Sequence, residues 1–223
     1  MTVFAEPIVT RPIVIAAGDV SLNGDLTVPA GARGLIVFAH GSGSSRHSTR
    51  NRAVAAVLQH GRLATLLMDL LTPGEERSDI VTASFRFDIP LLGARVVASI
   101  DWVAAHEPTA SLPIGVFGAS TGAAAALMAA AARPAIVRAV VSRGGRPDLA
   151  ADALPDVVAP TLLIVGGRDG VVIDLNQQAF DQLTHEKDMK IVPGATHLFE
   201  EPGALDEVSR LASDWFVTHL EVQ

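Results

Sequence analysis

The sequence predicts an α/β protein with a mostly parallel sheet that is covered by helices on both faces. Two observations support this fold class. Short apolar runs alternate with longer segments of helical periodicity along the 223 residues, which is the pattern of parallel strands joined by crossover helices. Several of these runs are apolar without interruption, as expected for strands buried on both faces. Because no repeat or linker breaks the alternation, we expect one domain over residues 1–223.

The N-terminal third predicts four strands and one helix. Two strands are expected at Ile8–Ala16 and Val20–Val28, and the absence of a helix between them favours an antiparallel edge. A strand buried on both faces is expected at Gly34–Ala39. A helix over Asn51–His60 and a strand over Leu63–Met68 follow.

The segment Thr72–Arg86 is polar and contains a Pro-Gly-Glu-Glu run. We predict a long loop there, of the kind that is either functional or mobile. Apolar residues then recur with a period of 3.6, which predicts a helix over Ile89–Ala105.

The C-terminal half continues the alternation of strands and helices. The expected strands are Leu112–Phe117, Ala135–Val141, Thr161–Val165 and Met189–Val192. The expected helices are an Ala-rich segment, a short central segment and an amphipathic C-terminal segment, over Ala123–Ala132, Gln177–Leu183 and Leu205–Phe216.

Composition limits the classes of partner. Hydrophobic residues make up 49% of the chain and charged residues 18%, as in an ordinary globular protein. The formal net charge is −7, which argues against nucleic acid or an anionic membrane as partner. Cysteine is absent, so disulfides and cysteine metal sites are excluded. We find neither a secretory leader nor an apolar run near the ~20 residues of a membrane span, and expect a cytoplasmic protein.

The pattern G-x-S-x-G occurs at residues 118–122, between a predicted strand and a predicted helix. In this context the pattern indicates a nucleophile elbow. A serine hydroxyl is a weak nucleophile and must project from a tight turn where a base can reach it. Ser120 is therefore the candidate nucleophile.

Asp169 and His197 follow Ser120 in the order expected for this type of sheet. Both come directly after predicted strands, and ligands of open parallel sheets bind beyond the carboxyl ends of the strands. His197 would accept the proton of Ser120, and Asp169 would orient the imidazole. Asp174 is the alternative carboxylate, although it could instead cap the following helix. His40 is the alternative histidine, which we assign to the turn that it begins.

The Gly- and Ser-rich segment after His40 is expected to help form an oxyanion hole. Negative charge on an attacked carbonyl oxygen requires fixed donors, usually backbone N–H groups. The candidates are the amides of Thr121 and Ser42. A phosphate-binding loop is disfavoured because the required lysine is missing, and a plain flexible turn is the remaining alternative.

Three further residues are candidates for substrate binding. Arg46 and Arg143 follow predicted strands and could orient a substrate carboxylate, or simply pair with Asp148 or the acidic pair at residues 75–76. Phe85, near the end of the polar loop, could form a pocket wall or belong to the core. No cluster of His, Asp and Glu has convincing metal-ligand spacing, so we expect no metal and no cofactor.

With HGSGSS, GASTG, GGRD and GATH in place, the chain resembles the α/β-hydrolases, and within them the dienelactone-hydrolase-like branch. The resemblance extends from about Pro12 to Leu220. It implies an eight-stranded sheet whose second strand is antiparallel, with Ser120, Asp169 and His197 as a triad. Ser42 and Thr121 would form the oxyanion hole. Some members of this branch are fused to a phosphoribosyltransferase domain.

The resemblance implies hydrolysis of small to medium carboxylic esters, with one departure from the family pattern. True dienelactone hydrolases use a cysteine nucleophile, and this chain has none, which favours serine esterase chemistry. No insertion is long enough for a cap domain. Acyl transfer or perhydrolysis with the same triad, and a non-catalytic binding module on this fold, are the alternatives. The natural ester and the oligomeric state are left open.

Overall fold

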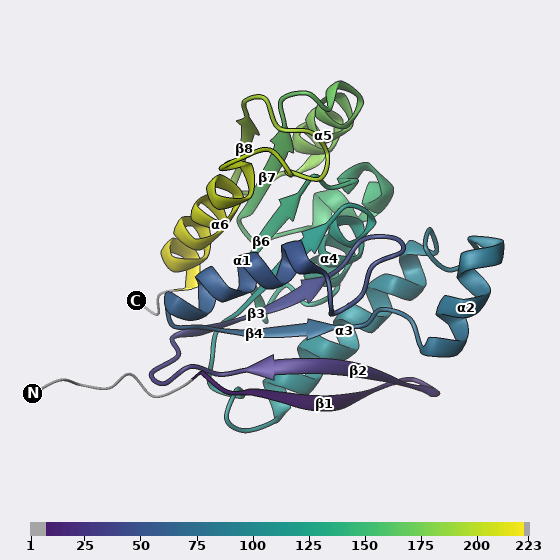
Figure 1. The fold of residues 1–223 in the computed structure, drawn as a ribbon, viewed down its shortest axis with the longest axis vertical. Helices are drawn as coiled ribbons and strands as arrows, with labels where there is room; N and C mark the ends of the chain where they lie inside the picture. Colours follow the sequence, from purple (N-terminus) through teal and green to yellow (C-terminus); the bar gives the residue numbers. More distant parts are fainter. Residues whose placement is uncertain (1–7, 221–223) are drawn as a thin grey trace, which may run out of the picture.

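The computed structural model describes residues 8–220, which form an eight-stranded sheet with helices on both faces (Figure 1). The strand order is β1-β2-β4-β3-β5-β6-β7-β8. The strands are β1 (Thr10–Ala17), β2 (Val20–Thr27), β3 (Gly34–Ala39), β4 (Leu63–Met68), β5 (Ile114–Ala119), β6 (Val137–Arg143), β7 (Thr161–Gly166) and β8 (Lys187–Val192). The helices are α1 (Thr49–His60), α2 (Pro73–Thr82), α3 (Ile89–Ala105), α4 (Thr121–Ala132), α5 (Gly170–Gln182) and α6 (Ala204–Leu220).

The directions of the strands confirm the predicted fold class. β2 runs antiparallel to both β1 and β4, and every pair from β4 to β8 is parallel. At the centre of the sheet Ala39 pairs with Gly118, and Ala119 pairs with Arg143. The carboxyl ends of β3, β5 and β6 therefore lie side by side, and the loops that leave them meet.

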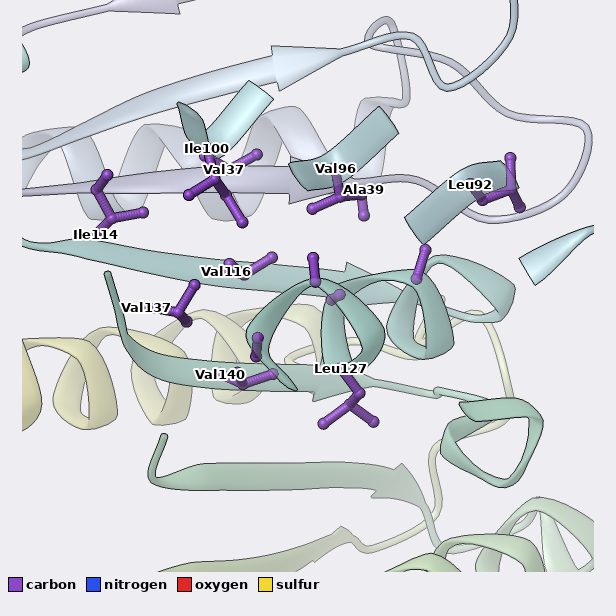
Figure 2. Packing of buried hydrophobic residues seen from close by; sticks show 14 of the residues in the cluster. Val37, Ala39, Leu92, Val96, Ile100, Ile114, Val116, Leu127, Val137 and Val140 are labelled. Carbon is purple, nitrogen blue, oxygen red and sulfur yellow. The ribbon is translucent and has the colours of Figure 1, made fainter. Parts of the chain in front are cut away.

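Two apolar layers fix the sheet between the helices. Side chains of β3 and β4 pack with α1 and α6 on one face, where Phe38 and Phe117 lie with their ring centroids 4.9 Å apart. Residues of α3 and α4 cover the other face. Figure 2 shows Val37 and Val116 of the sheet in the layer that also holds Val96 of α3. The small side chains of α4 let this helix lie close to the strands, and nearly all of them are buried.

The predicted strands and the long helices are confirmed within a few residues, and three segments differ. The expected loop Thr72–Arg86 contains helix α2. Thr72 caps it by accepting from the amide of Glu75, whose carboxylate accepts from the amide of Thr72. This capping box, with Pro73 at the first helical position, is a helix-start signal that the polar composition concealed.

The second difference is helix α5, which begins at Gly170 rather than at Gln177. Its first turn holds the continuous apolar run Val171-Val172-Ile173, which shows no helical period in the sequence, although only Val172 of the three is buried. A 3-10 segment over Pro147–Asp156, interrupted at Ala151, was also not predicted.

The structure bears on two expectations about location only in part. None of the helices within residues 8–220 has the length and apolar character needed to cross a membrane. The expectation that the chain has no secretory leader concerns residues 1–12, and the first seven of these lie outside the described part.

Candidate active site

Ser120 lies at a sharp turn between β5 and α4. Its backbone angles, φ 51° and ψ −125°, are rarely adopted by a non-glycine residue. The turn needs glycine on both sides. A Cβ at Gly118 would lie 2.4 Å from Cα of Ala123, and one at Gly122 would lie 2.4 Å from the carbonyl oxygen of Ala39. Strain of this kind persists where the surrounding structure enforces it, and it is concentrated at functional sites.

The structure brings Ser120, His197 and Asp169 together. Nδ1 of His197 lies 2.7 Å from Oδ2 of Asp169, and Nε2 of His197 lies 3.4 Å from Oγ of Ser120. Since the carboxylate can only accept, Nδ1 carries the proton and Nε2 is left as the acceptor for the serine hydroxyl. The 3.4 Å separation is longer than a tight hydrogen bond, as is common in such sites without substrate.

The position of Asp169 explains why its carboxylate is available. Asp169 is the N-cap residue of α5, but its side chain does not cap the helix and turns to His197. Asp174, the alternative, lies within α5 on its exposed side, so it does not cap this helix as expected. Loops after three different strands thus supply the three side chains.

His40 is buried behind the site and is held as a neutral imidazole. Its Nδ1–H donates to the carbonyl oxygen of Gly41 at 2.9 Å, and its Nε2 accepts from the amide of Leu70 at 3.0 Å. Burial lowers the pKa of His40, against the opposing effects of the Gly41 carbonyl and of the carboxylates of Asp69 and Glu76. His40 therefore joins the loop after β3 to the loop after β4, a role beyond the turn to which the sequence assigned it.

Ser42 and Thr121 are in direct contact at the tip of the loop after β3. The amide of Ser42 donates to Oγ1 of Thr121 at 3.0 Å, and the two hydroxyl oxygens are also 3.0 Å apart. The two residues expected to form the oxyanion hole are thus adjacent, but the Ser42 amide is already engaged by a side chain.

A cavity of about 110 Å³ lies beside the elbow. Gly41 lines it, and a Cβ on Gly41 would come within 2.8 Å of Cβ of Ser120, so the cavity opens next to the candidate nucleophile. Its apolar walls are Leu71, Ile80 and Leu92, and its polar lining includes the Ser42 loop, Thr121, Asp69, Glu76, Asp79 and Arg86.

Phe85, for which the sequence left open a place in a pocket wall or in the core, is half-buried and is not among the residues that line this cavity. Helix α2 provides the wall instead, through Ile80. Ile80 was not among the predicted site residues, because residues 72–86 were expected to form a loop. The capping signal at Thr72 could have revealed the helix.

Polar contacts hold α2 at both ends. Glu75 binds the guanidinium of Arg95 through both carboxylate oxygens, at 2.6 and 2.9 Å. Asp79 accepts from the amides of Phe85 and Arg86 and from Nε of Arg86. Burial works against ionisation of both carboxyls, but the hydrogen bonds and arginine charges outweigh it and lower the pKa of each. Of the residues of α2, only Asp79 is buried.

The two arginines expected near the site have different surroundings. Arg46 pairs with Asp69 and Asp25, not with the carboxylates expected from the sequence. Arg143 is 5% exposed, and its Nη2 donates to Oδ1 of Asn51.

No carboxylate lies within ion-pair distance of Arg143 in the part of the chain that the structure describes. Burial, together with the positive charge of Arg50, lowers the pKa of Arg143 to about 10. The nearby Arg146 does pair with Asp148, as the sequence suggested for this segment, with both contacts at 2.8 Å.

Within residues 8–220, no three His, Asp or Glu side chains come together as a metal site would require. What the site offers is a serine, an imidazole and a carboxylate in hydrogen-bonded sequence beside a partly apolar cavity. This arrangement can activate a hydroxyl for attack on a carbonyl group.

The fold and the arrangement of this site are those of an α/β-hydrolase. The model of the dienelactone hydrolase family matches residues 30–218, and the chain belongs to this family of hydrolases. A solved dienelactone hydrolase from Anabaena variabilis is 56% identical, with a TM-score of 0.94 over 96% of this chain and 99% of that one.

More distant structures share the fold. Est1E from Butyrivibrio proteoclasticus superposes with a TM-score of 0.77 at 16% identity, over 93% of this chain and 98% of that one. Among curated proteins, two from Mycobacterium tuberculosis that carry the provisional name phosphoribosyl transferase are 58% identical over 96% of this chain. The match covers 47% of each, so the chain spans about half the length of these relatives.

Proposed function

We propose that this protein is a serine hydrolase that cleaves carboxylic esters of small to medium size through an acyl-enzyme intermediate. The observation that carries the proposal is the continuous contact from Asp169 through His197 to Ser120 at a strained turn. Membership of a hydrolase family supports it. In this proposal Ser120 is the nucleophile, His197 the general base and acid, and Asp169 the residue that orients the imidazole.

The proposed reaction has two balanced halves. Oγ of Ser120 bonds to the carbonyl carbon while its proton passes to Nε2 of His197. The bond from that carbon to the alcohol oxygen then breaks, and His197 returns the proton to the leaving alcohol. Water attacks the acyl-enzyme in the same way, so the carboxylic acid leaves and Ser120 regains its proton.

The carbonyl oxygen carries negative charge during each attack and needs fixed donors. The amide of Thr121, the first residue of α4, supplies one donor at a helix end whose partial charge favours an anion. We expect the second donor where the loop of Ser42 meets the elbow, since the amide of Ser42 and the hydroxyl of Thr121 lie in contact there.

The lining and the volume of the cavity favour acyl groups that are uncharged and short. Its apolar walls suit a short hydrocarbon chain. Glu76 also lines the cavity, and its carboxylate has no ion-pair partner within the described residues, so like-charge repulsion disfavours an acyl group that carries its own negative charge. The cavity volume of about 110 Å³ limits the length of an acyl chain that it can enclose.

A panel of p-nitrophenyl esters of increasing acyl length tests the proposal. Wild type should hydrolyse the short esters, and Ser120→Ala should fold normally while losing about 10⁴- to 10⁶-fold in rate. If Ser120→Ala keeps a tenth of the activity, Ser120 is not the nucleophile. Adding alcohols to the same assay separates hydrolysis from acyl transfer, since a transferase would form the new ester in place of the acid.

A further inference from the structure

The hydroxyl of Thr121 occupies an unusual position in the proposed oxyanion hole. The amide of Ser42, the expected second donor, points at Oγ1 of Thr121 and lies 3.0 Å from it. Oγ of Ser42 lies 3.0 Å from the same atom and 3.4 Å from the carbonyl oxygen of Arg86. A carbonyl oxygen that entered the hole would therefore compete with the Thr121 side chain for the Ser42 amide.

The hydrogen bonds around the Thr121 hydroxyl decide whether its proton can be donated to a ligand. A hydroxyl has two acceptor lone pairs and one proton. Ser42 can satisfy both lone pairs of Oγ1, one through its amide and one through its single hydroxyl proton, whose other acceptor, the carbonyl oxygen of Arg86, lies farther away at 3.4 Å than Oγ1 at 3.0 Å. Apart from Oγ of Ser42, the described residues place no acceptor within hydrogen-bond distance of Oγ1, so the Thr121 proton is free for a ligand when Ser42 donates.

The location of this proton suits the charge that develops in the proposed reaction. Thr121 directly follows Ser120, is 4% exposed and lines the cavity. Its amide and its hydroxyl belong to one residue at the rigid start of α4. The hydrogen bond from the Ser42 amide, joined by a second one when the Ser42 hydroxyl donates, polarises the Thr121 hydroxyl and makes its proton a stronger donor.

We propose that the side-chain hydroxyl of Thr121 is the second donor of the oxyanion hole, and that Ser42 is a positioning residue that acts through it. The inference rests on the proposed serine-hydrolase function and refines it. The oxyanion is then held by two donors of one residue, the amide and the hydroxyl of Thr121. The loop of Ser42 supplies the hydrogen bonds that orient the hydroxyl.

The competing interpretation predicts the opposite sign. If the Thr121 hydroxyl only fills the hole at rest and must withdraw, its removal frees the Ser42 amide. A Thr121→Val variant would then react as fast as wild type or faster. Valine has nearly the same shape as threonine, so this change isolates the hydroxyl.

The test measures the rate of covalent labelling by an alkyl fluorophosphonate, which requires no knowledge of the natural ester. Its phosphoryl oxygen occupies the oxyanion hole as Ser120 attacks phosphorus and fluoride leaves. Thr121→Val should be labelled about 10²-fold more slowly or worse, as for loss of an oxyanion donor. Thr121→Ser should stay within about fivefold of wild type. Thr218→Val, the same change on α6, where the threonine bonds to Asp214, should leave the rate unaltered.

A double-mutant cycle tests the role of Ser42. Ser42→Ala should slow labelling of the wild-type background about three- to tenfold, and should have no further effect in the Thr121→Val background, because its action passes through the missing hydroxyl. Independent, multiplicative effects would show that Ser42 contacts the oxyanion itself and would overturn its role as a positioning residue.

The outcomes separate this proposal from the proposed function. Wild type that is not labelled, or Ser120→Ala that is labelled equally, would contradict the serine-hydrolase function. Wild type that is labelled together with an equally fast Thr121→Val would overturn only the role of the Thr121 hydroxyl. Melting temperatures accompany every rate, and if Thr121→Val does not fold, the ratio between Thr121→Ser and Thr121→Ala gives the same answer.

Discussion

The carboxylate of Asp169 lies 2.7 Å from Nδ1 of His197, a residue 28 positions later in the sequence. Asp169 is the N-cap residue of α5, yet its side chain accepts a hydrogen bond from the imidazole and does not cap the helix. An N-cap aspartate would normally stabilise its helix by accepting from a backbone amide. Here that stabilisation is given up, and the imidazole gains a fixed tautomer.

This contact predicts how the two candidate carboxylates differ. Asp169→Asn should reduce kcat/KM about 10⁴-fold, because an amide can donate to Nδ1 and favours the wrong tautomer. Asp174→Asn, on the exposed side of α5, should cost less than about tenfold. Steady-state kinetics of both variants with one p-nitrophenyl ester check this. The reverse ranking would assign the orienting carboxylate to Asp174.

The cavity wall predicts a change in acyl preference on α2. Ile80→Phe should lower kcat/KM for hexanoyl relative to acetyl esters by more than about threefold, because the larger ring narrows the cavity. Stability should hardly change, since Ile80 is 72% exposed.

Val81→Phe is the matched control, because Val81 is 85% exposed and does not line the cavity. Phe85→Ala should scale both esters equally. If Phe85→Ala shifts the ratio more than Ile80→Phe does, the pocket wall has been assigned to the wrong residue.

His40 predicts a pH dependence of stability. Its pKa in the folded protein is lowered, so the unfolded chain, with a histidine pKa of ~6.5, takes up the proton first. The contribution of neutral His40 is therefore complete above pH ~6.5 and declines as the pH falls below that value.

Urea unfolding at pH 7.5 and 5.0 measures this effect. His40→Asn should be less stable than wild type by about 1–2 kcal/mol at pH 7.5, because the Leu70 amide loses its acceptor. The gap should narrow at pH 5.0. A gap that stays constant or widens would mean that His40 does not titrate as described.

For Arg143 we predict that replacement by an apolar residue does not destabilise the protein, unlike most substitutions of buried residues. Within residues 8–220 its buried guanidinium has one hydrogen bond, to Asn51, and lies 5.9 Å from the ring centroid of Phe199. A buried charge without a carboxylate partner carries a desolvation cost that an apolar side chain of similar size avoids. Arg143→Met should therefore keep or raise the melting temperature.

The same variant tests the expected role of Arg143 in binding substrate. If Arg143 only supports the loop of Phe199, a neutral ester and a carboxylate-bearing ester should change by the same factor. A loss of tenfold or more confined to the carboxylate-bearing ester would identify Arg143 as a substrate ligand.

The parts of the fold that follow from one-dimensional patterns could be predicted. Continuous apolar strands and the 3.6-residue period of α3 can be recognised directly in the sequence. Ser120, Asp169 and His197 could be placed at one edge of the sheet because each follows a predicted strand. Helix α2 has no apolar face, so periodicity could not reveal it, and its capping box was the available signal.

Side-chain contacts between residues far apart in the chain could not be predicted from the sequence. Nothing near Arg46 indicated that Asp69 and Asp25 would approach it, because Asp25 lies on β2 and Asp69 directly follows β4, both distant in sequence. The contact between Ser42 and the hydroxyl of Thr121 joins residues 79 positions apart, and only the folded chain shows that the side chain engages the amide.

The polar attachment of α2 has a practical consequence. Because this helix adds one buried residue to the interior and is fastened by ion pairs and a cap, residues on its cavity side can be exchanged without disturbing the sheet. A library of variants confined to residues 73–82 that keeps Glu75 and Asp79 would vary the shape of the cavity while the sheet and the other helices stay unchanged. Substitutions in the library would then change the preference for one acyl group over another with little change in the stability of the fold. Laboratory evolution of new substrate preferences requires this separation, because most substitutions otherwise cost stability.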